Sequence, residues 1–68
     1  MSVLTELDRE ILIYLRIVGS TDVEDIAEVL SVSERSVQEA LHKLDDSGHV
    51  IMRCGWYRIS EAAKTGRI

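Results

Sequence analysis

Polar side chains with hydrogen-bonding groups are spread along residues 33–47, opposite a regular apolar pattern. Apolar residues at i, i+3, i+4 and i+7 turn one face of a helix inward; they are Val37, Ala40, Leu41 and Leu44. The outward side chains are then Glu34, Arg35, Ser36, Gln38, Glu39, His42 and Lys43. A helix exposing such groups has the shape and the donors and acceptors for base edges in the major groove of DNA.

Five of these side chains match particular contacts, and we predict that they read bases. Arg35 can form a bidentate pair with guanine and Gln38 with adenine, while Glu39 can accept from the amine of cytosine. Ser36 and His42 can make shorter polar or phosphate contacts. The alternative is an ordinary solvated helix, because many surface helices carry a similar mixture. Carboxylates such as Glu39 oppose phosphate, which favours selective over tight non-specific binding.

Hydroxyl and cationic groups on and after this helix are candidates for phosphate contacts. They are Ser33, Lys43, Arg53, Arg58 and Lys64, with Arg67 closer to the end of the sequence. Each such contact adds about one unit to the salt dependence of binding. The alternative for Arg53 and Arg58 is that they keep a hairpin soluble and protect its edge.

Other chemistry is poorly represented. His42, His49 and Cys54 are the soft metal ligands, and their spacing matches no zinc pattern. We find no nucleophile–base pair and no phosphate-binding glycine loop. We therefore expect no enzyme, no metal, no cofactor and no small-molecule ligand. The single cysteine excludes an internal disulfide and favours a reducing compartment.

Three helices are predicted to position the polar groups, over about residues 5–18, 22–31 and 34–47. Thr5 and Ser33 are the expected N-caps of the first and third helices. The second helix opens with a capping-box pattern, Thr21-x-x-Glu24. Gly19 follows the first helix as a stop signal.

After the third helix, the pattern changes to residues that favour strands. We expect strands over about residues 49–54 and 56–60, and a short tail helix over about 61–65. Cys54 and Gly55 fit a tight turn between the strands, with Gly55 supplying a positive φ. The order predicts a single domain over residues 1–68, mainly α with a small β-hairpin (α+β): a three-helix bundle plus two strands.

The first helix carries more apolar residues than one core-facing stripe needs. The stripe consists of Leu7, Ile11, Tyr14, Leu15 and Val18. Either a small core also wraps around Leu12, Ile13 and Ile17, or these three form a face that meets a partner subunit. Trp56, beside the turn, is either a lid on the core or an exposed aromatic that contacts DNA or a partner.

Charge is unevenly distributed along a chain whose net charge is −4. Residues 1–32 have a net charge of −5, residues 33–48 of −2 and residues 49–68 of +3. A DNA-binding surface would therefore use the last third and the exposed side of the third helix. No run approaches the roughly 20 apolar residues that span a bilayer. Charges at residues 8–10 interrupt any signal peptide, so we expect a soluble, cytoplasmic protein.

The central residues resemble the helix-turn-helix of winged-helix transcriptional regulators. The pattern I-A-x-x-L-x-V-S-x-x-x-V-x-x-x-L-x-x-L comprises Ile26, Ala27, Leu30, Val32, Ser33, Val37, Leu41 and Leu44. Residues 44–50 resemble the junction between recognition helix and wing. Residues 57–62 resemble a strand end of small archaeal, viral and bacterial regulators. The wing tip is shorter than is usual in this family.

The resemblance implies a winged helix that binds double-stranded DNA sequence-specifically as a transcriptional regulator. Its third helix would enter the major groove and its wing would contact the phosphate backbone. Because so small a module buries a modest interface, we expect a homodimer on two half-sites. The alternative is a winged helix that makes protein–protein contacts in a larger transcription or multi-subunit assembly, which the acidic first half favours.

Overall fold

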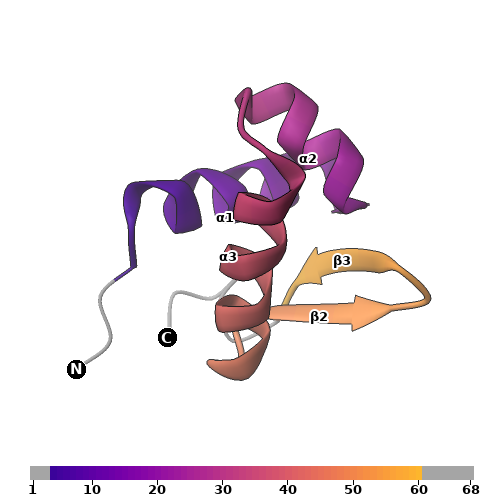
Figure 1. Ribbon diagram of the computed structural model, residues 1–68. Helices are drawn as coiled ribbons and strands as arrows, with labels where there is room; N and C mark the ends of the chain where they lie inside the picture. Colours follow the sequence, from indigo (N-terminus) through magenta and orange to yellow (C-terminus); the bar gives the residue numbers. More distant parts are fainter. Residues whose placement is uncertain (1–3, 61–68) are drawn as a thin grey trace.

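Three helices and a three-stranded antiparallel sheet form the computed structural model, which describes residues 4–60 (Figure 1). In chain order the elements are α1 (Glu6–Val18), β1 (Ser20–Thr21), α2 (Val23–Leu30), α3 (Glu34–Asp46), β2 (Val50–Arg53) and β3 (Trp56–Ile59). The α+β class is as predicted, and the predicted element ends differ from the observed ones by about one residue. The tail helix expected over about 61–65, with Lys64 and Arg67, lies outside the described residues.

Thr5 and Ser33 cap α1 and α3, as predicted. The Thr5 hydroxyl accepts from the backbone N–H of Asp8 at 3.1 Å, and an Asp8 carboxylate oxygen accepts from the Thr5 N–H at 3.0 Å. This reciprocal pair is a capping box, which satisfies N–H groups that the helix leaves free. The Ser33 hydroxyl accepts from the N–H of Ser36 at 3.1 Å.

Thr21 belongs to a strand that the sequence pattern does not reveal. The sheet has the order β1-β3-β2, so the predicted two-stranded hairpin is only part of a three-stranded sheet. The capping box expected at Thr21 is wrong: Asp22 caps α2, and its carboxylate accepts from the Asp25 N–H at 2.9 Å. Two residues are too few for the alternation that identifies a strand.

The core lies where the three helices meet the sheet. Its buried apolar side chains are Ile11, Leu15, Ile26, Ala27, Val37, Ala40, Leu41, Leu44, Val50 and Ile59. They include all four residues of α3 that the spacing turned inward. Val18 is exposed rather than part of the core stripe, since it ends α1 just before the chain turns at Gly19 (φ 89°). Leu12 packs against the core, whereas Ile13 and Ile17 are 60% and 76% exposed.

Short connections fix how α3 is presented. Ser31 ends α2 in a left-handed conformation (φ 58°), and the N–H of Val32 bonds back to the Ala27 carbonyl at 3.0 Å. This sharp reversal sends α3 across α1, in front of it in Figure 1, with the hairpin extending to one side. Cys54 and Gly55 both have positive φ (51° and 82°), as a two-residue type I′ hairpin turn requires.

Candidate nucleic-acid interface

The five predicted base-reading residues lie together on the outer face of α3. Arg35, Gln38, Glu39 and His42 are exposed, and Ser36 is half-buried near the start of the helix. They share this face because their inward neighbours fill the core, which leaves α3 no freedom to rotate about its axis. The helical spacing therefore predicted correctly that these side chains point away from the core, while their role in reading bases stays a prediction.

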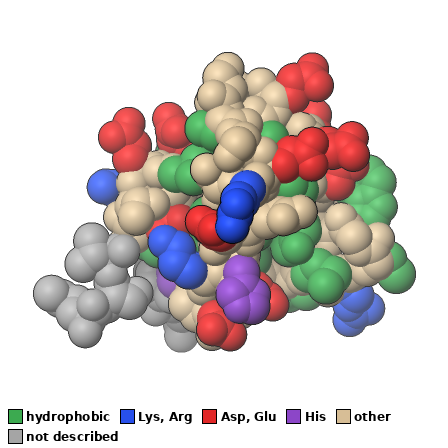
Figure 2. All heavy atoms as spheres, viewed as in Figure 1, with side chains coloured by type: hydrophobic (Ala, Val, Ile, Leu, Met, Phe, Trp, Pro, Cys, Tyr) green, Lys and Arg blue, Asp and Glu red, His purple; other side chains and the backbone are tan. Residues whose placement is uncertain are grey.

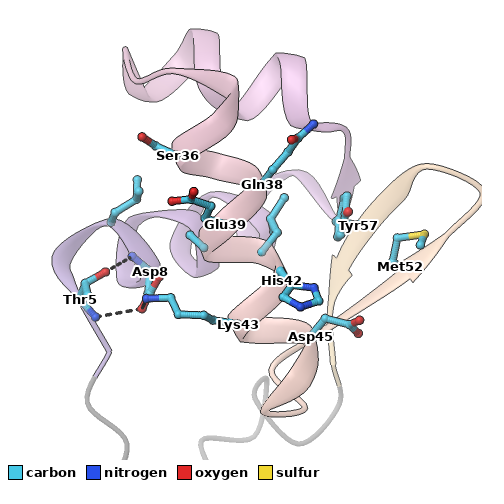
Figure 3. Close-up of a pocket in the computed structure, with 13 residues that line it drawn as sticks. Thr5, Asp8, Ser36, Gln38, Glu39, His42, Lys43, Asp45, Met52 and Tyr57 are labelled. Atoms are coloured by element: carbon cyan, nitrogen blue, oxygen red, sulfur yellow. Dashed lines mark hydrogen bonds and ion pairs between the residues drawn. The ribbon is translucent and has the colours of Figure 1, made fainter.

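A hollow runs along this face of α3, between the start of α1 and the hairpin (Figure 3). In this view Glu39 and Lys43 lie toward α1, while Gln38 and His42 lie toward the hairpin. Met52 and Tyr57 form the hairpin side of the hollow. The sequence analysis missed these two residues. Each lies two positions from the predicted turn at Cys54 and Gly55, and that symmetry could have shown that they are paired across the two strands.

Arg35 is paired with Glu39 one helical turn away. Their Nε and Oε2 atoms are 3.7 Å apart, and the two side chains are 89% and 72% exposed. An exposed pair of this kind contributes little and is screened by salt. Both groups therefore remain available to an incoming ligand.

Lys43 reaches back to α1 and pairs with Asp8. Their Nζ and Oδ2 atoms are 3.4 Å apart, and the Lys43 side chain is 60% exposed while that of Asp8 is 3% exposed. The second Asp8 oxygen, Oδ1, is buried and has no hydrogen-bond partner within the described part of the chain. A buried carboxylate with one unsatisfied oxygen makes this ion pair costly to break.

The other phosphate candidates are not all beside α3. Ser33 is exposed at the start of the helix, where its hydroxyl donates to the Ser36 hydroxyl at 2.9 Å. Arg53 and Arg58 lie on the hairpin, but they point to the sheet face opposite Met52 and Tyr57 because side chains alternate along a strand. The structure does not bring the two hairpin arginines together with the polar face of α3.

Acidic groups interrupt the basic ones on the face that contains α3. Figure 2 shows carboxylates gathered over α2 and others between the cationic side chains, without a continuous basic stripe. Three acidic residues and one lysine line the hollow, namely Asp8, Glu39, Asp45 and Lys43. This face therefore offers specific hydrogen bonds rather than a strong positive field.

A hydrogen-bonded cluster that the sequence did not predict fixes α1, β1 and α2 relative to one another. The hydroxyl of Tyr14 and the hydroxyl of Thr21 both donate to the same oxygen of Asp25, the latter at 2.7 Å. The Tyr14 bond, followed by the Thr21 bond, lowers the pKa of Asp25 from its ordinary value, and the bond to Asp25 raises the pKa of Tyr14. The cluster positions α2, which in turn supports α3.

The side chains that could ligate a soft metal are dispersed. His49 is buried, with its Nδ1 2.6 Å from the Ser47 hydroxyl, and Cys54 is exposed in the hairpin turn. Within residues 4–60, no group of three or more His, Cys, Asp or Glu side chains is placed to hold a metal ion. None of the helices in this same range has the length and apolar character needed to cross a membrane.

No protein-family model, curated protein or solved structure matches this chain.

Proposed function

We propose that this protein binds double-stranded DNA sequence-specifically as a winged-helix transcriptional regulator, with α3 in the major groove. The observation that carries the proposal is the division of α3 into two faces. Val37, Ala40, Leu41 and Leu44 are buried, while the opposite face presents amide, guanidinium, imidazole and carboxylate groups outward. A helix held this way can enter the groove with its polar face toward the bases.

The N-terminal half of α3 is the part that reads bases in this proposal. Arg35 pairs with a guanine, for which it must leave Glu39, and that exchange is inexpensive because their pair is exposed. Gln38 pairs with an adenine, and Glu39 accepts from a cytosine amine. Ser36 and His42 supply shorter contacts beside these three residues.

Phosphate contacts then come from the two ends of the same helix. Ser33 and the free N–H groups at the start of α3 suit a phosphate oxygen, because the positive end of the helix dipole lies there. Lys43 is held beside the hollow by Asp8 and is exposed enough to reach a second phosphate. With few such contacts, non-specific binding is weak and base recognition provides much of the affinity.

We further propose that two copies bind two half-sites. A single module of this size buries a small interface, and pairing brings two such interfaces onto one operator. Ile13 and Ile17 on the outer side of α1 support this proposal because they are large, exposed and one helical turn apart.

The test is a selection of binding sites from a random duplex library, followed by titration of the selected and a scrambled duplex at several salt concentrations. We expect a defined sequence to emerge and to bind more tightly than the scrambled duplex. The salt slope should correspond to a small number of phosphates. Failure of any sequence to be enriched, with no duplex bound at low salt, would contradict the proposal.

One observation favours a second candidate function, a winged-helix module that binds another protein in a multi-subunit assembly. Carboxylates outnumber cations along the hollow beside α3, and they belong to Asp8, Glu39 and Asp45. Such a surface fits a cationic partner better than it fits DNA. The same titration separates the two functions, since a protein module leaves every duplex unbound.

A further inference from the structure

The outer face of the sheet carries cations with no carboxylate among them. Cross-strand pairing sets Arg53 opposite Trp56 and Ile51 opposite Arg58, and β1 adds Ser20 opposite Arg58. Residues directly opposite in an antiparallel pair share one face, so these five side chains form a single surface, which we call the sheet patch. It lies on the other side of the sheet from Met52, Tyr57 and the hollow beside α3.

The sheet patch is accessible and partly apolar. Arg53 and Arg58 are exposed, Trp56 is 52% exposed, and Ile51 is half-buried between them. A shallow hollow is lined by these residues together with Ser20, and it is also bordered by Tyr57, which lies between Trp56 and Arg58 in β3. Trp56 and Ile51 therefore add apolar area to a surface that also carries two guanidinium groups, a combination enriched at protein interfaces.

Within the described residues, the lining without acidic side chains extends beyond the hairpin. A second hollow shares Ser20 and Arg58 with the first and continues to Arg16 and Val18 at the end of α1. Neither hollow has an Asp or Glu among its lining residues in the range 4–60. In a chain with twelve acidic and eight basic residues, this segregation leaves the patch positive, whereas acids and cations are mixed on the face of α3.

We propose that the sheet patch binds an acidic segment of a partner protein, with carboxylates on Arg53 and Arg58 and an apolar side chain on Trp56 and Ile51. Guanidinium groups bind carboxylates through two parallel hydrogen bonds. Tryptophan and arginine are also the residue types that most often dominate protein interfaces. The proposal holds under either function of α3, because the two faces are separate.

The composition of the patch favours a protein over a nucleic acid. Trp56 and Ile51 add apolar surface, which phosphates do not contact, and the patch has only two cations, Arg53 and Arg58. The patch also faces away from α3, so a duplex held by α3 does not lie along it. A second copy is disfavoured as well, since in a symmetric pair the patch would meet itself and set like charges together.

The test uses the whole chain and a synthetic fluorescein-labelled peptide, (Glu-Glu-Leu-Glu)3, followed by anisotropy and by the emission of Trp56, the only tryptophan. We expect binding that weakens with salt and changes Trp56 emission, and no binding of (Lys-Lys-Leu-Lys)3. Arg53→Gln and Arg58→Gln should each weaken peptide binding by about fivefold or more. Arg9→Gln removes the same charge from α1 and should leave binding nearly unchanged.

Several outcomes would overturn the proposal. One is that the peptide leaves Trp56 emission unchanged while duplex or single-stranded DNA changes it, and that Arg53→Gln and Arg58→Gln abolish that change. The patch would then bind phosphates rather than an acidic peptide. If Arg9→Gln weakens the peptide equally, the attraction comes from net charge rather than from the patch. If sedimentation shows an oligomer that Arg53→Gln dissociates, the occupant is a second copy. No change in Trp56 emission with any probe also removes the proposal.

Discussion

Arg35 and Lys43 are both cations on the exposed part of α3, but their surroundings give them different roles. Arg35 is nearly fully exposed at the end that would reach bases, whereas Lys43 is tethered to a buried carboxylate near the other end. A planar guanidinium can recognise one base edge, while an ammonium group acts mainly as a point charge. The two residues therefore separate sequence recognition from phosphate contact.

Arg35→Ala is expected to cost about 1–3 kcal/mol of binding free energy on the preferred duplex and to relax base choice at one position. Lys43→Ala should weaken all duplexes alike and lower the salt slope by about one. Titration of selected and single-base-substituted duplexes measures both effects. An equal loss for Arg35→Ala on every sequence would place Arg35 on a phosphate instead.

Asp8 is a residue whose stabilising role follows from its contacts. It caps α1, anchors Lys43 and is almost fully buried. Asp8→Ala removes the cap and the ion pair together, and we expect a loss of about 1–3 kcal/mol in the free energy of unfolding, measured with urea. Asp8→Asn keeps an acceptor for the Thr5 N–H and should lose less.

Glu6→Ala is the matched control for Asp8, since Glu6 is an exposed acid in the same first turn. It should change stability by a few tenths of a kcal/mol to about 1 kcal/mol, through the helix dipole alone. Equal losses for the Glu6 and Asp8 variants would show that the capping box and the ion pair contribute nothing beyond charge.

At the scale of elements, the hairpin turn combines one suitable residue with one unsuitable residue. Both central positions have positive φ, which glycine adopts freely at position 55 and cysteine does not at position 54. Asparagine tolerates this conformation, so Cys54→Asn should raise the free energy of unfolding by about 0.5–1 kcal/mol. Cys54→Ser removes the thiol without this preference, and a gain no larger than that of Cys54→Ser would contradict the explanation.

The joint between α1, β1 and α2 should depend on pH. Hydrogen bonds from Tyr14 and Thr21 lower the pKa of Asp25 below its ordinary value of 3.8. The folded chain therefore binds this proton less tightly than the unfolded chain, so the contribution is present above pH 3.8 and is lost as pH falls through the lowered pKa. Tyr14→Phe should be less stable than the natural chain at neutral pH, and the difference should shrink in acid.

Urea unfolding at a series of pH values between neutrality and strong acid measures this effect. Tyr57→Phe is the control, because the same ring-hydroxyl removal there leaves Asp25 unchanged. Stability curves for Tyr14→Phe and the natural chain that run parallel at every pH would show that the Tyr14–Asp25 bond does not shift the Asp25 pKa.

Predictability from sequence differed between elements for physical reasons. The helices carry periodic apolar faces and capping residues, so α3 and its outward set were located from spacing alone. β1 has two residues and exists because β3 pairs with it, which no local pattern records. Likewise, Lys43 and Asp8 are 35 residues apart, and only the packing of α3 on α1 brings them together.

The hairpin shows how much of the candidate site a turn can predict. A two-residue loop at Cys54 and Gly55 pairs Arg53 directly with Trp56. Arg58 is two residues beyond Trp56 on the same strand, so Arg53 and Arg58 must share a face. What the sequence did not contain is which face turns toward α3. The orientation of the hairpin is set by Val50 and Ile59, which are buried in the core. Met52 and Tyr57 lie two residues from them on each strand and therefore on the same face.

At the scale of the whole molecule, charge is separated between faces. The face of α3 mixes acids with its cations, while the outer sheet face has arginines without acids in the described range. Because the two surfaces lie on different sides of the sheet, two partners can bind at once without competing for the same charged groups. Two large exposed apolar side chains, Ile13 and Ile17, lie one helical turn apart on α1.

This pair is the basis for the last prediction, which concerns the proposed dimer. Ile13 and Ile17 are exposed by 60% and 76% although both are large and apolar, while Leu12 is partly used by the core. If α1 pairs with α1 of a second copy, Ile13→Glu with Ile17→Glu places carboxylates in the interface. Sedimentation should then show a folded monomer where the natural chain is a dimer, with helical circular dichroism unchanged.

Val29→Glu is the control for this experiment, because Val29 is an exposed apolar residue on α2 with 51% exposure. It adds the same kind of charge to an apolar surface site away from α1, so the dimer should persist. If Val29→Glu dissociates the dimer and the α1 variant does not, α2 rather than α1 forms the interface. A natural chain that sediments as a monomer both free and on a duplex with two half-sites would instead mean that each α3 binds its site alone, without a partner copy.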